Sequence, residues 1–271
     1  MPPLSRSLAM ALPAIVVFAA FWLLPIAHLL VVGGSGEQGL STYWLVLTAA
    51  GYRRSLLATI GLSAAVTAAA LLVSGIGGFF LQRQRFRGRT VLVALLSFPL
   101  AFPGVVVGFL VILLAGRQGL IGTITEWITG ERLVFAYGIA GLFLGYLYFS
   151  IPRTILTIMA SVEKLDVSLE EAARTLGAGP MEVLRDVILP GLRPALVSAG
   201  AICFATSMGA FGTAFTLATQ INVLPITIYN EFTNYANFAV AAALSLVLGF
   251  VTWVILALAR QFAGAQAAAA A

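Results

Sequence analysis

Six apolar stretches, each about as long as a membrane is thick, constrain this chain more than any other feature of its sequence. A helix needs roughly 20 apolar residues to cross a hydrocarbon core of about 30 Å. The predicted spans are residues 7–32, 55–81, 90–115, 134–159, 195–218 and 236–259. We therefore expect one all-helical transmembrane domain over residues 1–271.

The composition supports a membrane protein and argues against a soluble one. Hydrophobic residues make up 61% of the chain and charged residues only 9%, whereas about 25% is usual in soluble domains. The net charge of +5 could suggest nucleic acid, but the basic residues lie between the apolar stretches. We interpret them as a signal for membrane topology, with no nucleic-acid partner.

The distribution of Lys and Arg predicts the orientation of the spans. If the N-terminus is cytoplasmic, eleven of the fifteen basic residues lie on the inner side, and both termini are cytoplasmic. The outer side then has Arg53, Arg54, Arg117 and Arg132. The basic run Gln82–Arg89 becomes a short inner loop; binding to lipid or nucleic acid is possible, but topology explains it without a partner. The inner residues are Arg6, Arg83, Arg85, Arg87, Arg89, Arg153, Lys164, Arg174, Arg185, Arg193 and Arg260.

Residues with chemical functions are scarce in the apolar stretches. His28 and Cys203 are each the single residue of their type, so neither a metal site nor an intramolecular disulfide is expected, and Cys203 should be a buried packing residue. Glycines spaced by four, Gly104 with Gly108 and Gly141 with Gly145, favour close helix packing. The segment 119–131, with Trp127, is amphipathic and should lie along the membrane interface.

The long polar interval Glu170–Pro194 interrupts the apolar pattern. Five of the ten acidic residues lie between Asp166 and Asp186. Ser168 and Glu171 have the spacing of a capping box, which predicts a helix start. An ordinary loop with solvated charges would look similar.

The same interval predicts a helix–turn–helix. Leu169, Ala172, Ala173 and Leu176 should form one small apolar face. Gly177 should stop the first helix. Pro180 should begin a second, short helix, which Pro190 and Pro194 should end before the fifth span starts.

At these residues the chain resembles the inner-membrane permease subunits of ATP-binding-cassette (ABC) importers. Their signature is Glu-Ala-Ala, three residues, Gly, nine residues, Ile, one residue and Leu-Pro. This chain has Glu171-Ala172-Ala173, Gly177, then Val187 where the family has Ile, and Leu189-Pro190. The stretches FPLAFPGVVVG (98–108) and SIPRTI (150–155) follow the family's order, and the resemblance covers about residues 55–260.

The resemblance implies a type I ABC importer permease fold in a bacterial inner membrane. Its coupling helix, within the loop 163–194 between spans four and five, would dock into a groove on a cytoplasmic ATPase. Implied partners are two ATPase subunits, a second permease chain, an extracytoplasmic substrate-binding protein and membrane lipid. Glu171 could cap the helix or make a charge contact with the ATPase. The implied coupling residues are Ser168, Glu170, Glu171, Ala172, Ala173, Arg174, Leu176, Gly177, Leu189 and Pro190.

Other classes of function find less support. A glycine loop of the Walker type, ending in Lys-Ser or Lys-Thr, does not occur, so ATP and Mg would bind to the partner ATPase and no cofactor to this chain. An ion-coupled secondary transporter usually has ionisable residues within its spans, but the ten carboxylates lie outside or at the ends of the apolar runs. A membrane enzyme lacks its catalytic groups, and a channel leaves the coupling loop unexplained.

Polar residues near the last two spans are candidates for the translocation path. Helix packing through hydrogen bonds explains the Ser and Thr residues at least as well. Glu231, near the outer mouth, could attract a cation or be a solvated loop charge. The candidates are Thr206, Ser207, Thr213, Thr216, Asn230, Glu231, Asn234 and Tyr235.

The segment 209–245 most resembles permeases grouped with spermidine and putrescine uptake systems. A polyamine is therefore the first choice of cargo, with an aminophosphonate, thiamine or ferric iron as alternatives. The lack of carboxylates within the spans fits a polycation poorly.

Overall fold

The structure, a computed structural model, describes residues 4–217 and 222–267. Over these ranges the chain forms helices and no strand, which confirms the all-α class. Six helical stretches are long and apolar enough to cross a membrane, as the sequence predicts. They are Ala11–Gly33, Ala50–Arg83, Gly104–Thr129, Ile139–Val162, Pro180–Met208 and Phe238–Gln261.

The contacts divide the chain into two compact units. The first unit comprises residues 1–56 and 227–250, and the second comprises residues 57–226 and 251–271. Two long helices, α4 (Ala50–Arg83) and α14 (Phe238–Ala267), contribute to both.

The first unit contains a long N-terminal helical stretch that turns back into a short helix. The stretch consists of α1 (Leu4–Phe18), the π-helical turn η1 (Ala19–Leu23) and α2 (Leu24–Gly33), and the short helix is α3 (Ser41–Thr48). The Tyr43 hydroxyl donates a hydrogen bond to the Leu30 carbonyl at 2.6 Å. A side chain on Gly33 would collide with that hydroxyl, so this glycine permits the close return of α3.

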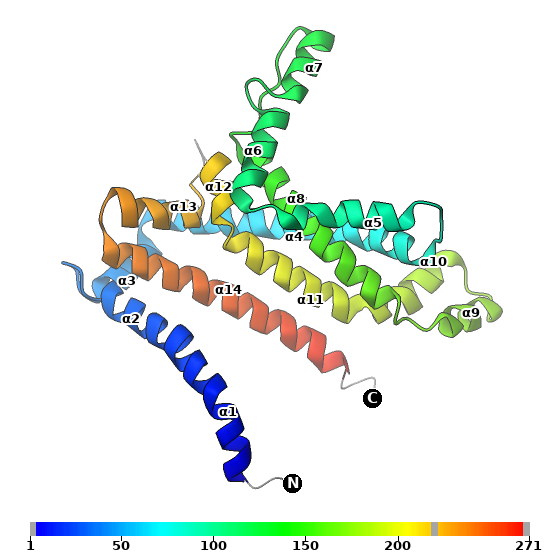
Figure 1. Ribbon diagram of the computed structural model, residues 1–271, viewed down its shortest axis with the longest axis horizontal. Helices are drawn as coiled ribbons and strands as arrows, with labels where there is room; N and C mark the ends of the chain where they lie inside the picture. Colours follow the sequence, from blue (N-terminus) through cyan, green and yellow to red (C-terminus); the bar gives the residue numbers. More distant parts are fainter. Residues whose placement is uncertain (1–3, 218–221, 268–271) are drawn as a thin grey trace. The chain divides into compact units, whose positions relative to one another are not determined.

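The second unit contains the main apolar core, which α4 shares with α8 (Ile139–Val162) and α11 (Leu189–Met208) (Figure 1). Val66, Leu142, Tyr146 and Cys203 belong to one buried cluster. Cys203 is a free, buried thiol, which confirms its predicted packing role.

The predicted third span is broken rather than continuous. The structure has α5 (Arg89–Ser97), a 3₁₀ turn η2 (Phe98–Ala101), a break at Phe102 and Pro103, and then α6 (Gly104–Ala115). Phe102 is extended, as expected for a residue before proline, and Pro103 cannot donate the hydrogen bond that a continuous helix needs. By length and composition, the candidate spanning stretch therefore begins at Gly104. It includes α6 and, after residues 116–119, α7 (Leu120–Thr129).

The predicted fifth span also has different ends. α11 begins at Leu189, earlier than predicted, and ends at Met208; a separate short helix, α12 (Phe211–Leu217), follows Gly209 and Ala210. The predicted end, Ala218, lies outside the described residues.

Three of the four paired glycines make close contacts between helices, as their spacing predicts. Gly104 and Gly108 on α6 lie against α12, where added side chains would collide with Thr213 and Thr216. Gly145 on α8 faces the Thr213 methyl group, whereas Gly141 lies against the backbone of Ala136, in the loop before α8. These glycines let α6, α8 and α12 approach one another closely.

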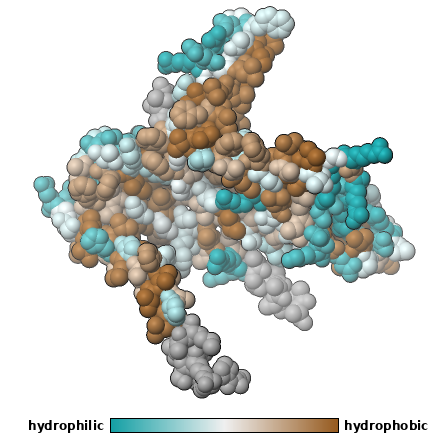
Figure 2. Space-filling model, in the orientation of Figure 1, coloured by the Kyte–Doolittle hydropathy of each residue, from teal (hydrophilic) through white to brown (hydrophobic). Residues whose placement is uncertain are grey.

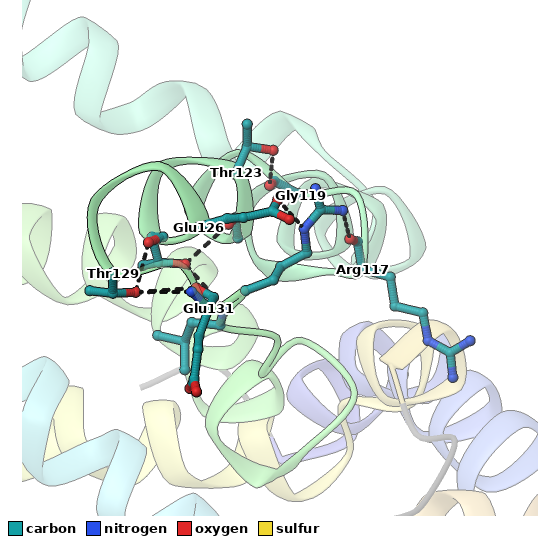
Figure 3. Close-up of polar contacts among 10 residues, drawn as sticks. Arg117, Gly119, Thr123, Glu126, Thr129 and Glu131 are labelled. Carbon is teal, nitrogen blue, oxygen red and sulfur yellow. Dashed lines mark hydrogen bonds and ion pairs between the residues drawn. The ribbon is translucent and has the colours of Figure 1, made fainter.

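Polar contacts hold the end of α7 to the segment that returns from it (Figure 3). The Arg132 guanidinium donates to the Glu126 carboxylate at 2.9 Å and to the Arg117 carbonyl at 2.9 Å. The Thr123 hydroxyl donates to the Gly119 carbonyl at 3.2 Å. Trp127 is 87% exposed, as an interfacial helix requires, and the position of α7 along a membrane surface stays a prediction.

Gly141→Ala should destabilise the second unit, because the new Cβ would lie 2.0 Å from the Ala136 carbonyl oxygen. Overpacking of this kind costs about 1–3 kcal/mol. Thermal unfolding of the detergent-purified protein measures the change. Gly61→Ala is the matched control, because nothing lies within 4 Å of the added atom; equal melting temperatures for both variants would contradict the packing argument.

Candidate functional site

The predicted coupling helix exists as α9 (Val167–Thr175), but its N-terminal cap differs from the prediction. The cap is Asp166, whose carboxylate accepts a hydrogen bond from the Ser168 N–H at 2.9 Å. This bond lowers the pKa of Asp166 below its usual value. Ser168 already lies within the helix, so the predicted Ser168–Glu171 capping box is wrong and Glu171 has no part in the cap.

The C-terminal stop at Gly177 is confirmed. Gly177 has a positive φ of 90°, a conformation that favours glycine. Its N–H donates to the Arg174 carbonyl at 3.0 Å, and the Ala178 N–H donates to the Ala173 carbonyl at 3.0 Å. This pair of bonds is a Schellman motif, which satisfies carbonyls that the helix end would leave free.

The second short helix begins at Pro180, as predicted, but it does not end at Pro190. α10 (Pro180–Val183) continues through a π-helical turn, η3 (Leu184–Ile188), directly into α11. Pro190 stands in the first turn of α11, where a missing N–H costs little in an isolated helix. The wider π turn before it lets the backbone remain helical, so Leu189 and Pro190 begin the fifth spanning helix without a break.

The side of α9 that packs against the rest of the protein differs from the apolar face that the sequence predicts. Ala173 is half-buried and packs against the cluster of Ile158, Val162, Val183, Ile188 and Leu192. Leu169 and Ala172 are exposed, and Leu176 is 90% exposed. The predicted face is therefore divided, with Ala173 turned inward and the other three residues outward. Glu171 and Arg174 are also exposed.

An ion pair fixes the inward side of α9. The Glu170 carboxylate is buried and pairs with the Arg83 guanidinium at the C-terminal end of α4. Arg83 also lies over the Phe79 ring, 5.6 Å from its centre. Glu170 is thus held within the chain, and Arg83, which topology alone seemed to explain, positions the helix.

The surface around α9 is the polar end of the second unit. Figure 2 shows hydrophilic residues gathered over α9, α10 and the adjoining end of α4. Exposed apolar side chains are set among them: Leu176, Met181 (73% exposed) and Leu189 (45% exposed). These side chains are accessible to another protein.

A separate cleft in the second unit brings together two of the predicted path residues. Thr206 and Thr213 line it with Arg153, which the sequence assigned only to topology. The cleft lies where the broken third span, α8 and the junction of α11 with α12 meet. Its lining residues are Pro99, Leu100, Phe102, Gly104, Val107, Phe149, Arg153, Thr206, Ala210, Gly212 and Thr213.

The hydroxyl groups of the predicted path residues make packing contacts. Thr213 donates to the Gly104 carbonyl at 2.9 Å, Thr206 to the Ile202 carbonyl at 2.9 Å, and Thr216 to the Gly212 carbonyl at 2.9 Å. Ser207 is fully buried. These bonds support the packing interpretation for the three threonines, although Thr206 and Thr213 still present atoms to the cleft.

The other four predicted path residues belong to the first unit, where α13 (Leu224–Tyr229) leads into the π-helical turn η4 (Asn230–Asn234). Glu231 is 8% exposed and accepts a hydrogen bond from the Tyr52 hydroxyl at 2.8 Å. It is therefore not a solvated loop charge, and a role in attracting a cation stays a prediction. The Asn234 amide donates to the Asn230 side-chain oxygen at 2.9 Å. Tyr235 is 70% exposed.

The family model for the inner membrane component of binding-protein-dependent transport systems matches residues 74–268. The chain belongs to this family. The match includes α9, α11 and the cleft. The molybdenum transport system permease protein ModB of Escherichia coli (strain K12) is 36% identical over 165 residues, 59% of this chain and 71% of ModB. The sulfate transport system permease protein CysT of the same strain is 32% identical over 220 residues, 78% of this chain and 77% of CysT.

Solved structures share the fold. A chain of a bacterial ABC transporter involved in the import of the acidic polysaccharide alginate has a TM-score of 0.80 and 18% identity, with 94% of this chain and 93% of that chain covered. A chain of the MetNI methionine ABC transporter has a TM-score of 0.61 and 18% identity, with 84% and 98% covered. The permease is thus a non-catalytic ABC importer subunit with the type I fold.

Exchanging the charges of Arg83 and Glu170 tests whether their ion pair positions α9. Glu170→Arg alone should place two positive charges together and speed amide hydrogen exchange in residues 167–175. The double variant Arg83→Glu with Glu170→Arg should slow it again, because the attraction is restored. Hydrogen-exchange mass spectrometry of the purified permease measures both. Glu171→Arg, at the exposed neighbour, is the control. Equally faster hydrogen exchange in both single variants would contradict the positioning role of the Arg83–Glu170 ion pair.

Proposed function

We propose that this permease forms half of the translocation path of an importer for a tetrahedral oxyanion of the molybdate or sulfate kind. The transport role is supported by the position of α9. The buried Arg83–Glu170 ion pair holds one side of this helix against α4, and its other side is exposed. Such a helix presents a fixed surface to a partner. The surrounding apolar side chains suit a groove on an ATPase subunit.

The permease relatives support an oxyanion as cargo. ModB and CysT are named for molybdenum and sulfate transport, and neither name points to a polyamine. The cleft agrees, because none of the residues that line it is acidic. A polycation would meet no opposite charge there, so polyamine, our first choice from the sequence, gives way to an anion.

The importer would need partners that bind ATP and deliver the cargo. Two ATPase subunits would carry ATP and Mg, a second permease chain would complete the path, and an extracytoplasmic binding protein would select the anion. Closure of the ATPase subunits on ATP would move α9. Because α10 continues into α11 without a break, that movement would reach the residues of the cleft.

Within the proposed docking surface, Leu176 and Glu171 have distinct roles. Leu176 would insert an apolar side chain into the ATPase groove, since it is 90% exposed on this chain. Glu171 would make the charge contact, because the alternative role in capping belongs to Asp166. Glu170, Ala173 and Gly177 would maintain the shape of α9, and Ser168, Ala172, Arg174, Leu189 and Pro190 would complete the surface.

ATP-dependent uptake into proteoliposomes tests the importer and its cargo. The complete complex with its binding protein should accumulate labelled molybdate or sulfate, and uptake should stop when ATP is omitted. Spermidine and an aminophosphonate are the comparison solutes. If the complex takes up spermidine and neither oxyanion, the proposed cargo is wrong. If uptake proceeds without ATP, the importer mechanism is wrong.

Changing the outward residues of α9 should separate ATP hydrolysis from transport. Leu176→Asp should lower uptake about tenfold or more, because a charge would be buried in the groove. Glu171→Gln should lower uptake several-fold through the loss of its charge contact. Uptake and ATPase rate are measured on the same proteoliposomes. Glu163→Gln, at an exposed carboxylate outside α9, is the control; normal coupling in Glu171→Gln would exclude the charge contact.

A further inference from the structure

Arg153 is a charged residue inside an apolar spanning helix. It lies in α8, whose sequence IAGLFLGYLYFSIPRTILTIMASV contains no other charged residue. It lies nine positions before Val162, the last residue of the helix, or about 14 Å along the axis at 1.5 Å per residue. Charged residues within spanning helices are costly, face a water-filled cavity or a partner group, and often mark the route of a substrate.

The positive charge of Arg153 is exposed in the cleft, and the cleft does not neutralise it. The ion pairs of the described residues join Arg83 to Glu170, Arg132 to Glu126 and Arg185 to Asp186, and do not include Arg153. Its side chain is accessible. One turn earlier on the same face of α8, Phe149 also lines the cleft, so this face of the helix is directed at the opening.

A second source of positive potential lies in the same cleft. α6 begins at Gly104, after the break at Pro103, and Gly104 is a lining residue. Its N-terminal cap, Pro103, has no polar side chain and makes no side-chain hydrogen bond to the helix. The N-terminal end of a helix carries partial positive charge. Broken helices in transporters often direct such ends at anionic substrates.

We propose that Arg153 binds the permeating oxyanion in this cleft and makes the path selective for anions. The inference rests on the proposed import function and deepens it by assigning a specificity-determining residue. The planar guanidinium can donate two parallel hydrogen bonds to two oxygens of a tetrahedral dianion. Phe149, Phe102 and Leu100 line the cleft beside Arg153 and offer no charge that would compete for the anion.

The competing explanation is that Arg153 serves membrane topology alone. An arginine that serves topology alone would need its charge only while the chain inserts into the membrane. Once the complex is assembled, a neutral residue at this position would leave transport unchanged, whatever the cargo. A residue that binds the anion should instead change the amount of anion transported per ATP hydrolysed.

The first experiment compares Arg153→Gln, Arg153→Lys and the wild-type complex in proteoliposomes with the binding protein present. Arg153→Gln should lower molybdate or sulfate uptake per ATP hydrolysed about tenfold or more, the size of a lost charge-assisted hydrogen bond. Arg153→Lys should recover part of it, because it keeps the charge but not the paired donors. Arg260→Gln, at an exposed arginine on α14 outside the cleft, should behave as wild type.

A second experiment tests the charge without relying on how each variant folds. Arg153→Cys is assembled and reconstituted first, and the new thiol is then modified with aminoethyl methanethiosulfonate, which adds a positive charge, or with methyl methanethiosulfonate, which adds none. The charged reagent should raise uptake and the neutral reagent should not. The wild-type complex, whose Cys203 is buried, is treated in parallel to correct for any effect on the partners.

The outcomes separate the two proposals. Normal anion uptake per ATP in Arg153→Gln, or equal rescue of Arg153→Cys by both reagents, would overturn the role of Arg153 and leave the importer intact. ATP-independent uptake by the wild-type complex would overturn the importer itself.

Discussion

The requirement that backbone groups find partners within the membrane governs the rest of this structure. A continuous helix meets it throughout its length, and interruptions are tolerated where protein or a water-filled cavity surrounds them. Two of the interruptions, at Pro103 and at Gly209–Ala210, border the same cleft. The breaks thus occur where backbone groups without a helical partner can face the cleft. Arg153, Thr206 and Thr213 line the same opening.

Close approach of the helices and exposure of α9 depend on different kinds of contact. Glycines at positions 104, 108 and 145 bring α6, α8 and α12 together by removing side-chain bulk. A buried charge pair, Arg83 with Glu170, holds α9 against the end of α4. The glycine contacts form the wall of the cleft. The ion pair leaves Glu171 and Leu176 facing outward. Both lie in the second unit and belong to the stretch that the family model matches.

The sequence predicts contacts within one turn of helix better than contacts between distant residues. Gly177 and Pro180 act locally, and their roles at a helix end and a helix start are confirmed. The number of long apolar helical stretches, six, agrees with the sequence for the same reason, although the third and the fifth have other ends than predicted. The cap at Asp166 was missed because Ser168 and Glu171 offered a competing local pattern. The pairing of Arg83 with Glu170 joins residues 87 positions apart, and no spacing rule reports such a contact. Arg153 shares its cleft with residues of other helices, so only the fold reveals it.

The π-helical turn η3 has a mechanical consequence. By joining α10 to α11 it makes residues 180–208 one continuous helical stretch of 29 residues. One end of this stretch adjoins α9, and the other carries Thr206 at the cleft. No loop interrupts the backbone between the two sites. A movement of α9 would therefore pass to the cleft along the backbone hydrogen bonds of one helix, without a relay of side chains.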